Sequence, residues 1–370
     1  MARLGDYVKI RTGKLDANAS NENGEYPFFT CSVQPLRINS YSYDCECVLV
    51  AGNGDLNVKY YNGKFDAYQR TYIIESNNKD ILSVPYLYCF LDKYVETLRK
   101  QSIGGVIKYI KLGNLTEAEI PLFDIATQEL IVRNIEKVNG LIVDRNKQLS
   151  KLDELVKSRF IETFGDLRNN PNSFDVVSFD DCVEYMGDIG SNGANKVVVD
   201  HLDMKDEEDY ALMVRFLNFT KNDFTDDVKY ISKEAYDFFK KSQIFGGELI
   251  ICKIGSAGQN YIMPYLNRPV SLGLNQIMVR INDKTIIPYL YQYLNSDYGK
   301  QLINGCINGA VTKSITKTEL KKIPVLIPPI DLQNEFATFV EQTDKLKLEV
   351  KESLEKLETL KKSLMQKYFG

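Results

Sequence analysis

Residues that could perform catalysis are few in this 370-residue chain. His201 is its single histidine and lies in the acidic stretch DHLDMKDEED. A Ser-His-Asp or Cys-His site through His201 is one interpretation, but a solvated loop histidine explains the residue with fewer assumptions. Cys45 and Cys47 flank Glu46 without a CxxC pair or a histidine cluster, so their spacing does not indicate a zinc site.

Two further motifs resemble a substrate or cofactor site only in part. The single Pro-Pro pair lies in IPPID, which does not fit the Asn/Asp-Pro-Pro-aromatic motif of amino-methyltransferases. The segment AGNGD at residues 51–55 is not followed by G-x-G-x-x-G, so it is more typical of a tight turn than of a cofactor loop. The sequence shows no catalytic constellation.

Composition excludes several classes of protein. No stretch of 18 apolar residues exists, so a membrane span is not expected. The start, MARLGDYVKI, lacks the apolar core of a signal peptide. Seven cysteines without a secretory signal indicate reduced thiols and a cytoplasmic location. A net charge of −4 argues against a generally basic surface, so any surface that faces nucleic acid must be local.

The chain is an internal duplication. The segment KLDELVKSRFIETFG at residues 151–165 returns as KLETLKKSLMQKYFG at residues 356–370. Without a gap, residues 104–165 align with residues 309–370, and 17 of the 62 pairs are identical. Upstream, VPYLYCFLD (84–92) returns as IPYLYQYLN (287–295), and VLVAGNGDLNVKYY (48–61) as LIICKIGSAGQNYI (249–262). The second half contains roughly 30 extra residues, which must lie between positions 183 and 249.

Each half ends in a long amphipathic helix with an apolar heptad seam. Apolar residues recur at alternating spacings of four and three over about four heptads. The Pro-bearing segments EIPLFDIATQE and KIPVLIPPIDLQNE mark the helix starts. The predicted seam positions are Ile135, Val138, Ile142, Leu149, Leu152 and Val156 in the first helix, and Val340, Val350, Leu354, Leu357 and Leu364 in the second.

These helices are expected to pair with each other. The alternative is that each packs only into its own globular unit, but the seam is too long and narrow for that. The chain connectivity then requires an antiparallel pair. Short β-branched runs such as CVLVAG and NQIMVRI predict strands in the globular parts. The sequence therefore predicts an α+β fold with two similar mixed α/β units (1–124 and 166–329), separated by two helices (125–165 and 330–370) that form an antiparallel coiled coil with a pseudo-two-fold axis.

This order of motifs resembles the specificity (S) subunits of type I restriction–modification systems. GELIICKIG at residues 247–255 is similar to the family's GD-apolar-apolar-IG strand and loop. IPYLYQYLN and INGAVTKSITKTELKKIPVLIPPIDLQNEF resemble the segment that ends a target-recognition domain and enters a conserved helix. LGDYVKIRTGK resembles the usual beginning. The acidic insertion around His201 and the near absence of a leader depart from the pattern.

The resemblance implies a non-catalytic subunit. Each target-recognition domain (1–124 and 166–329) would read one half of a bipartite, asymmetric site in double-stranded DNA. The helices would set the gap and bind two methyltransferase (M) subunits, through which restriction (R) subunits join. The chain would hold no cofactor or metal, since S-adenosylmethionine, ATP and Mg²⁺ would belong to the partners, and no membrane is involved. A coiled-coil scaffold with two protein-binding heads and an unrecognised enzyme are the alternatives, and salt-dependent duplex binding separates the first reading from the scaffold.

Loop side chains suited to DNA are the candidate site of this subunit. Arg and Lys read guanine, Asn and Gln read adenine, and cations anchor phosphates. In the first half the expected loop contacts are Lys14, Lys59, Tyr60, Lys64, Tyr68, Gln69 and Arg70. In the second half they are Asn192, Lys196, Lys253, Ser256, Gln259, Asn275 and Gln276. Gln69-Arg70 and Asn275-Gln276 fall at comparable places before a strand. Any single one could be an ordinary loop residue, so the prediction concerns the set.

Overall fold

The structure is a computed structural model that describes residues 1–370, and it divides into two compact units. Unit 1 comprises Met1–Gln148 and Glu349–Gly370, and unit 2 comprises Leu149–Leu348. The boundary falls inside both long helices, whereas the domains predicted from the sequence end where the helices begin. Each unit therefore contains one globular part and one end of each helix.

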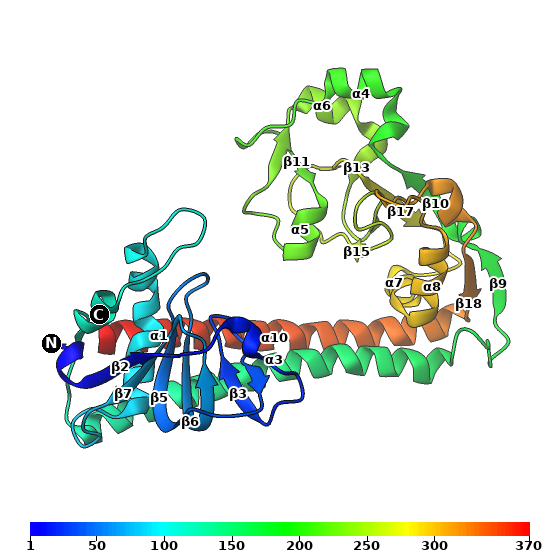
Figure 1. The fold of residues 1–370 in the computed structure, drawn as a ribbon. Coiled ribbons are helices and arrows are strands. Elements are labelled where there is room, and N and C mark those ends of the chain that lie inside the picture. Colours follow the sequence, from blue (N-terminus) through cyan, green and yellow to red (C-terminus); the bar gives the residue numbers. More distant parts are fainter. The chain divides into compact units, whose positions relative to one another are not determined.

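Unit 1 is built on a six-stranded sheet (Figure 1). The strands, in spatial order, are β2 (Val8–Thr12), β7 (Thr71–Ser76), β5 (Tyr43–Ala51), β6 (Val58–Ala67), β3 (Tyr26–Phe29) and β4 (Leu36–Ile38). All neighbours are antiparallel except β3 and β6. The apolar run at residues 47–50 is fully buried, because β5 lies between β7 and β6 and is covered on both faces.

Two helices, two 3₁₀ turns and a small ladder complete the globular part of unit 1. The ladder joins β1 (Ala2–Arg3) to β8 (Glu119–Ile120), and the helices are α1 (Val84–Gln101) and the short α2 (Leu112–Thr116), with 3₁₀ turns at Leu4–Asp6 and Ala17–Ala19. Ser83 caps the start of helix α1, and its hydroxyl accepts a hydrogen bond from the Tyr86 backbone N–H at 3.2 Å. Its apolar face, including Tyr86 and Phe90, lies in one core with Val48 and Ile74 of the sheet.

Unit 2 repeats four consecutive strands of this sheet, beginning with the edge strand β2. Its strands run in the order β10 (Val183–Gly187), β17 (Gln276–Ile281), β14 (Leu249–Cys252) and β15 (Asn260–Ile262), all antiparallel. This is the order β2-β7-β5-β6 of unit 1. The register agrees as well, since Cys252 pairs with Gln276 as Ala51 pairs with Thr71. The duplication predicted from the sequence is thus a duplication of topology.

The inserted residues of unit 2 form most of a second four-stranded sheet. Its order is β12 (Lys229–Ile231), β11 (Ala211–Val214), β16 (Val270–Leu272) and β13 (Gln243–Ile244), accompanied by α4 (Asn195–His201), α5 (Phe216–Lys221) and α6 (Lys233–Phe238). All of these except β16 lie between positions 183 and 249, where the extra residues were predicted. Here the His201 ring stacks on Phe238 at 3.9 Å and its Nδ1 lies 2.8 Å from the Val197 carbonyl oxygen, which is a packing role.

Several of the remaining elements of unit 2 have counterparts in unit 1. They are α7 (Ile287–Asn295), α8 (Asp297–Gly305) and α9 (Lys317–Lys321), the ladder of β18 (Pro324–Ile327) with β9 (Asp175–Ser178), and 3₁₀ turns at Phe179–Cys182, Ile189–Asn192 and Lys240–Ser242. Tyr289 and Tyr293 of α7 are fully buried, as are Tyr86 and Phe90 of α1. No helix of the structure is both long enough and apolar enough to cross a membrane.

The two long helices are α3 (Ile125–Phe164) and α10 (Ile330–Phe369), of 40 residues each. In unit 1, Ile131 and Ile135 of α3 share a core with Met365 and Phe369 of α10. In unit 2, the Phe336 ring lies 5.4 Å from the Phe160 ring. In each unit the beginning of one helix therefore meets the end of the other. The helices pair antiparallel, and the predicted fold class is confirmed.

Burial along both helices follows a three–four spacing. Ile135, Val138 and Val156 are buried, and the other predicted seam positions are half-buried, namely Ile142, Leu149, Leu152, Val340, Val350, Leu354, Leu357 and Leu364. Polar residues interrupt this stripe. Arg145 donates to the Ser353 hydroxyl at 3.2 Å within unit 1, and Lys347 pairs with Asp153 at 2.8 Å within unit 2. The seam is therefore fully buried only near the ends of the helices, and its middle combines half-buried apolar residues with polar contacts.

Candidate nucleic-acid interface

Three loops of unit 1 are joined at one edge of the sheet. The Gly52 N–H donates to the Arg70 carbonyl at 2.8 Å, and the Ile110 N–H donates to the Gly52 carbonyl at 2.9 Å. The Gly54 N–H donates to the Lys108 carbonyl at 2.9 Å. These bonds join the turn after β5, the turn before β7 and the loop of residues 102–111, which we call the loop edge of unit 1.

Unit 2 has the same loop edge. The Lys253 N–H donates to the Asn275 carbonyl at 2.7 Å, the Ile315 N–H to the Lys253 carbonyl at 2.9 Å and the Gly255 N–H to the Lys313 carbonyl at 3.0 Å. Each of these bonds has its counterpart in unit 1. The backbone therefore equates Lys253 with Gly52 and Asn275 with Arg70.

A cavity of about 510 Å³ opens at the loop edge of unit 1. The side chains of Gln69 and Arg70 line it, are exposed, and form no hydrogen bond or ion pair within the chain. Tyr109 and Lys111 line it from the third loop, and the remaining lining residues are Thr12, Gly52, Tyr72, Ile110 and Leu112. Two cations, a free amide and aromatic rings therefore meet in one open site without a carboxylate.

The corresponding place in unit 2 contains an ion network. Asp188 is 5% exposed and accepts hydrogen bonds from the Lys253 ammonium at 2.7 Å and the Lys317 ammonium at 2.9 Å. The Ser191 hydroxyl donates to the same carboxylate at 2.9 Å. Burial alone would raise the pKa of the Asp188 carboxyl, but these three hydrogen bonds lower it to about 2. The network joins three loops that are distant in the sequence.

Asp188→Asn tests the strength of this network. Because the folded pKa lies below the unfolded value of about 3.9, the charged carboxylate stabilises the fold above about pH 4, and this contribution is lost as the pH falls toward 2. We expect the variant to be less stable at pH 7 by on the order of 2 kcal/mol, with the difference from wild type narrowing between pH 4 and pH 2. Urea unfolding followed by circular dichroism measures it, and a difference that is constant with pH contradicts the assignment.

Three predicted loop residues of unit 1 lie in a strand instead. Lys59, Tyr60 and Lys64 belong to β6, because Asn62-Gly63 does not form a turn there but pairs across to Glu46 and Cys45. Burial lowers the pKa of Lys59, and burial together with the hydrogen bond to Glu46 at 2.8 Å raises the pKa of Tyr60 to about 12. The Lys64 ammonium lies 4.7 Å from the centre of the Tyr41 ring. The prediction that these three residues lie in loops was wrong.

Some of the other predicted residues have side chains without a hydrogen-bond partner, and others are already hydrogen-bonded within the chain. Lys14 is exposed and Tyr68 half-buried in unit 1, while Lys196 is exposed on α4 and Ser256 half-buried in unit 2. The exposed Gln259 accepts a bond of 3.4 Å from the Tyr261 hydroxyl. Asn192 is occupied on both sides of its amide, since it donates to Ser242 at 2.6 Å and accepts from the Lys241 N–H at 2.9 Å. Asn192 thus connects loops within the insertion.

Gln276 is placed differently from the prediction. It is the first residue of β17, is 1% exposed, and leaves both polar atoms of its side chain without a partner. The register makes it the counterpart of Thr71, which is equally buried, and not of Arg70. The repeat alignment was therefore shifted by one residue. Because successive side chains of a strand point to opposite faces, this shift placed an inward-pointing residue where an exposed one was expected. Asn275, with a left-handed φ of 63°, is the exposed counterpart of Arg70.

Tyr109, Lys111, Asp188 and Lys317 were not among the residues predicted from the sequence. The first two follow the repeated Gly-x-Val-x-Lys at 104–108 and 309–313, so the identities of the duplication could have indicated their loop. Asp188 and Lys317 are 129 residues apart, and no local pattern joins them.

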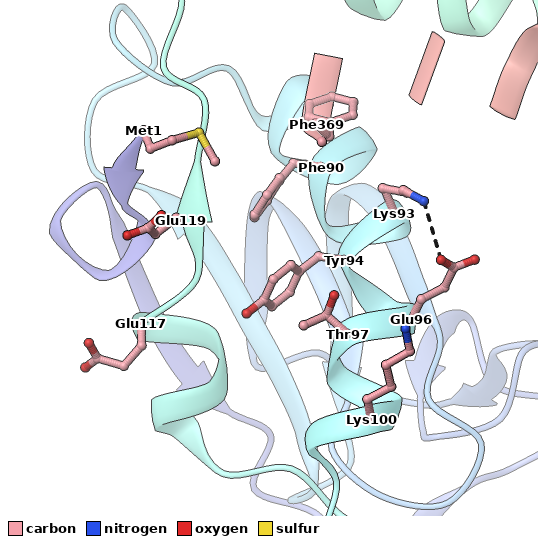
Figure 2. A pocket seen from close by; sticks show the side chains of 11 residues that line it. Met1, Phe90, Lys93, Tyr94, Glu96, Thr97, Lys100, Glu117, Glu119 and Phe369 are labelled. Atoms are coloured by element: carbon pink, nitrogen blue, oxygen red, sulfur yellow. Dashed lines mark hydrogen bonds and ion pairs between the residues drawn. The ribbon is translucent and has the colours of Figure 1, made fainter. Parts of the chain in front are cut away.

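A second cavity of unit 1, of about 490 Å³, lies where the end of α10 meets α1 (Figure 2). Phe369 and Phe90 form its apolar wall, with ring centres 6.0 Å apart. Figure 2 shows Lys93 paired with Glu96, and Glu117 and Glu119 on the opposite side. Three carboxylates make this cavity unsuited to DNA phosphates, in contrast to the loop edge.

The two units thus share a duplicated scaffold and a loop edge with the same backbone hydrogen bonds. The family model described as "Type I restriction modification DNA specificity domain" matches residues 1–152 and 187–361. The chain therefore belongs to the family of type I restriction–modification DNA specificity proteins, and it is a specificity subunit of such a system.

Known relatives agree with this assignment. The chain is 27% identical over 396 aligned residues to the type I restriction enzyme EcoDI specificity subunit of Escherichia coli, which covers 99% of this chain and 86% of that protein. The crystal structure of the type I restriction–modification S subunit from M. genitalium superimposes with a TM-score of 0.62 at 15% identity, covering 100% of this chain and 95% of that one. A chain from a structural study of complex assembly and conformational transition of the type I R-M system superimposes with a TM-score of 0.58 at 15% identity. The match covers 100% of this chain and 96% of that one. At these identities the structural matches establish the fold.

Proposed function

We propose that the chain is the non-catalytic subunit that directs its complex to a bipartite, asymmetric site in double-stranded DNA, each unit reading one half. One observation supports this proposal above the others. The two loop edges have equivalent backbone hydrogen bonds but different side chains. Arg70 of unit 1 corresponds to Asn275 of unit 2, and Gly52 corresponds to Lys253. A repeated scaffold with diverged contact residues suits two half-sites of different sequence.

The long helices, in this proposal, set the gap between the half-sites and bind two M subunits. Their outer faces expose large apolar residues, which mark protein-binding surfaces when they gather. Leu141 and Leu155 of α3 are 39% and 47% exposed, and their repeat counterparts Leu346 and Leu360 of α10 are 50% and 46% exposed. Identical exposed leucines on both helices suit two copies of the same partner.

The proposal assigns the chemistry to other subunits. S-adenosylmethionine, ATP and Mg²⁺ belong to the M and R subunits, and R subunits join through M. A cytoplasmic location is part of the proposal, because all seven cysteines of the chain are free.

Reconstitution tests the proposal. The chain mixed with its cognate M subunits and S-adenosylmethionine is expected to methylate duplex DNA at one bipartite motif, whereas the chain alone and the M subunits alone transfer no methyl group. Binding of the complex to duplex should weaken as salt rises, because phosphate contacts release counterions. Methyl transfer by the purified chain without M subunits would contradict the non-catalytic role.

A further inference from the structure

Three of the residues that line the cavity at the loop edge of unit 1 are replaced in unit 2 by charged side chains. By strand register Asp188 corresponds to Thr12, and by the backbone bonds Lys253 corresponds to Gly52. Lys317 is the first residue of α9 as Leu112 is the first residue of α2. Three small or apolar lining residues of unit 1 are thus replaced by an ion network that occupies the same place.

The cavity of unit 1 presents a fixed backbone with free side chains. The Arg70 carbonyl accepts from the Gly52 N–H at 2.8 Å and from the Cys31 thiol at 3.6 Å, so the turn that carries the guanidinium is held on two sides. A Cβ atom on Gly52 would lie 2.4 Å from that carbonyl oxygen, so any other residue at this position would require the turn to shift. The Arg70 side chain is exposed and has no partner within the chain.

The side chains that line the cavity suit contacts with one nucleotide of duplex DNA. An unpaired guanidinium donates two parallel hydrogen bonds to O6 and N7 of guanine. Lys111, on the opposite loop, supplies an ammonium that suits a phosphate, and no carboxylate lines the cavity to compete with either contact. Tyr109 is 37% exposed and offers its ring beside them.

We propose that this cavity receives a guanine edge of the first half-site, with Arg70 at the base and Lys111 at a neighbouring phosphate. The inference rests on the proposed function and names the reading site of one unit. In unit 2, Asp188 pairs with both Lys253 and Lys317 at this position, so these two ammonium groups are held within the chain and the second half-site is read with a different set of side chains. The two units then differ in the arrangement of side chains that reads the DNA, and not only in single contact residues.

The test uses the complex of the full chain with its M subunits, and duplexes in which each base pair of the first half-site is replaced in turn. Arg70→Ala is expected to remove discrimination at one G·C pair by about 10- to 100-fold, while the duplex lacking that pair binds wild type and variant equally. Arg70→Lys should retain part of the discrimination. Lys111→Ala should weaken all duplexes alike and reduce the salt slope by about one. Lys9→Ala, an exposed lysine of β2 outside the cavity, is the matched control and should change neither.

The possible outcomes distinguish an error in the guanine assignment from an error in the proposed function. Equal weakening of every duplex by Arg70→Ala, no effect, or lost discrimination at an A·T pair each overturns the guanine assignment, provided that circular dichroism shows the variant folded. Discrimination lost in the second half-site would overturn the assignment of the cavity to the first. A wild-type complex that prefers no sequence contradicts the proposed function itself.

Discussion

Phe336→Ala is expected to destabilise unit 2 by about 3–5 kcal/mol, the range for removing a fully buried aromatic ring. The Phe336 ring is 1% exposed and lies edge-on against Phe160 at 5.4 Å and Phe164 at 5.5 Å. Both partners come from the other long helix, and Tyr289 of α7 closes the group at 4.8 Å from Phe164. The substitution therefore leaves a cavity where the helix pair joins the globular part.

Urea unfolding followed by circular dichroism measures this loss. Leu130→Ala, on α3 but with its side chain 52% exposed, is the matched control and should change the free energy of unfolding by less than about 0.5 kcal/mol. A loss below about 1 kcal/mol in Phe336→Ala would show that the aromatic group does not hold the helices to unit 2.

Local signals were sufficient to predict the long helices. The predicted ranges, 125–165 and 330–370, agree with Ile125–Phe164 and Ile330–Phe369 to within one residue. Prolines precede the start of each long helix, and Gly165 and Gly370, both with positive φ, follow the helix ends. Each helix boundary therefore depends on a few neighbouring residues. The three–four spacing likewise depends only on neighbours within one helix.

The loop edge depended on contacts that no local pattern reveals. Asn62-Gly63 has the composition of a hairpin turn, but pairing with β5 on one side keeps it inside a ten-residue strand. Gln276 was assigned to a loop because the repeat alignment had no structural register to correct it by one residue. The Asp188 network joins residues 188, 253 and 317, and its existence depends on the folded sheet. At the loop edge, the types of residue could be predicted from the sequence, but the directions of their side chains could not.

Exchange of residues 1–124 for the corresponding domain of another family member has the largest expected effect on function. Unit 1 possesses its own sheet, core and loop edge, and unit 2 has a separate set, so each half-site should be read independently. The exchange leaves both long helices in place. The recognised motif is therefore expected to change completely in one half and to keep its other half and its gap.

Sequencing of methylated bases in a host that expresses the exchanged chain with its M subunits tests the central claim most directly. The wild-type chain should give one bipartite methylated motif, and the exchanged chain should give a motif with one new half, one retained half and the same gap. A change in both halves, or an unchanged motif from an active exchanged chain, would contradict the account of two units that each read one half-site.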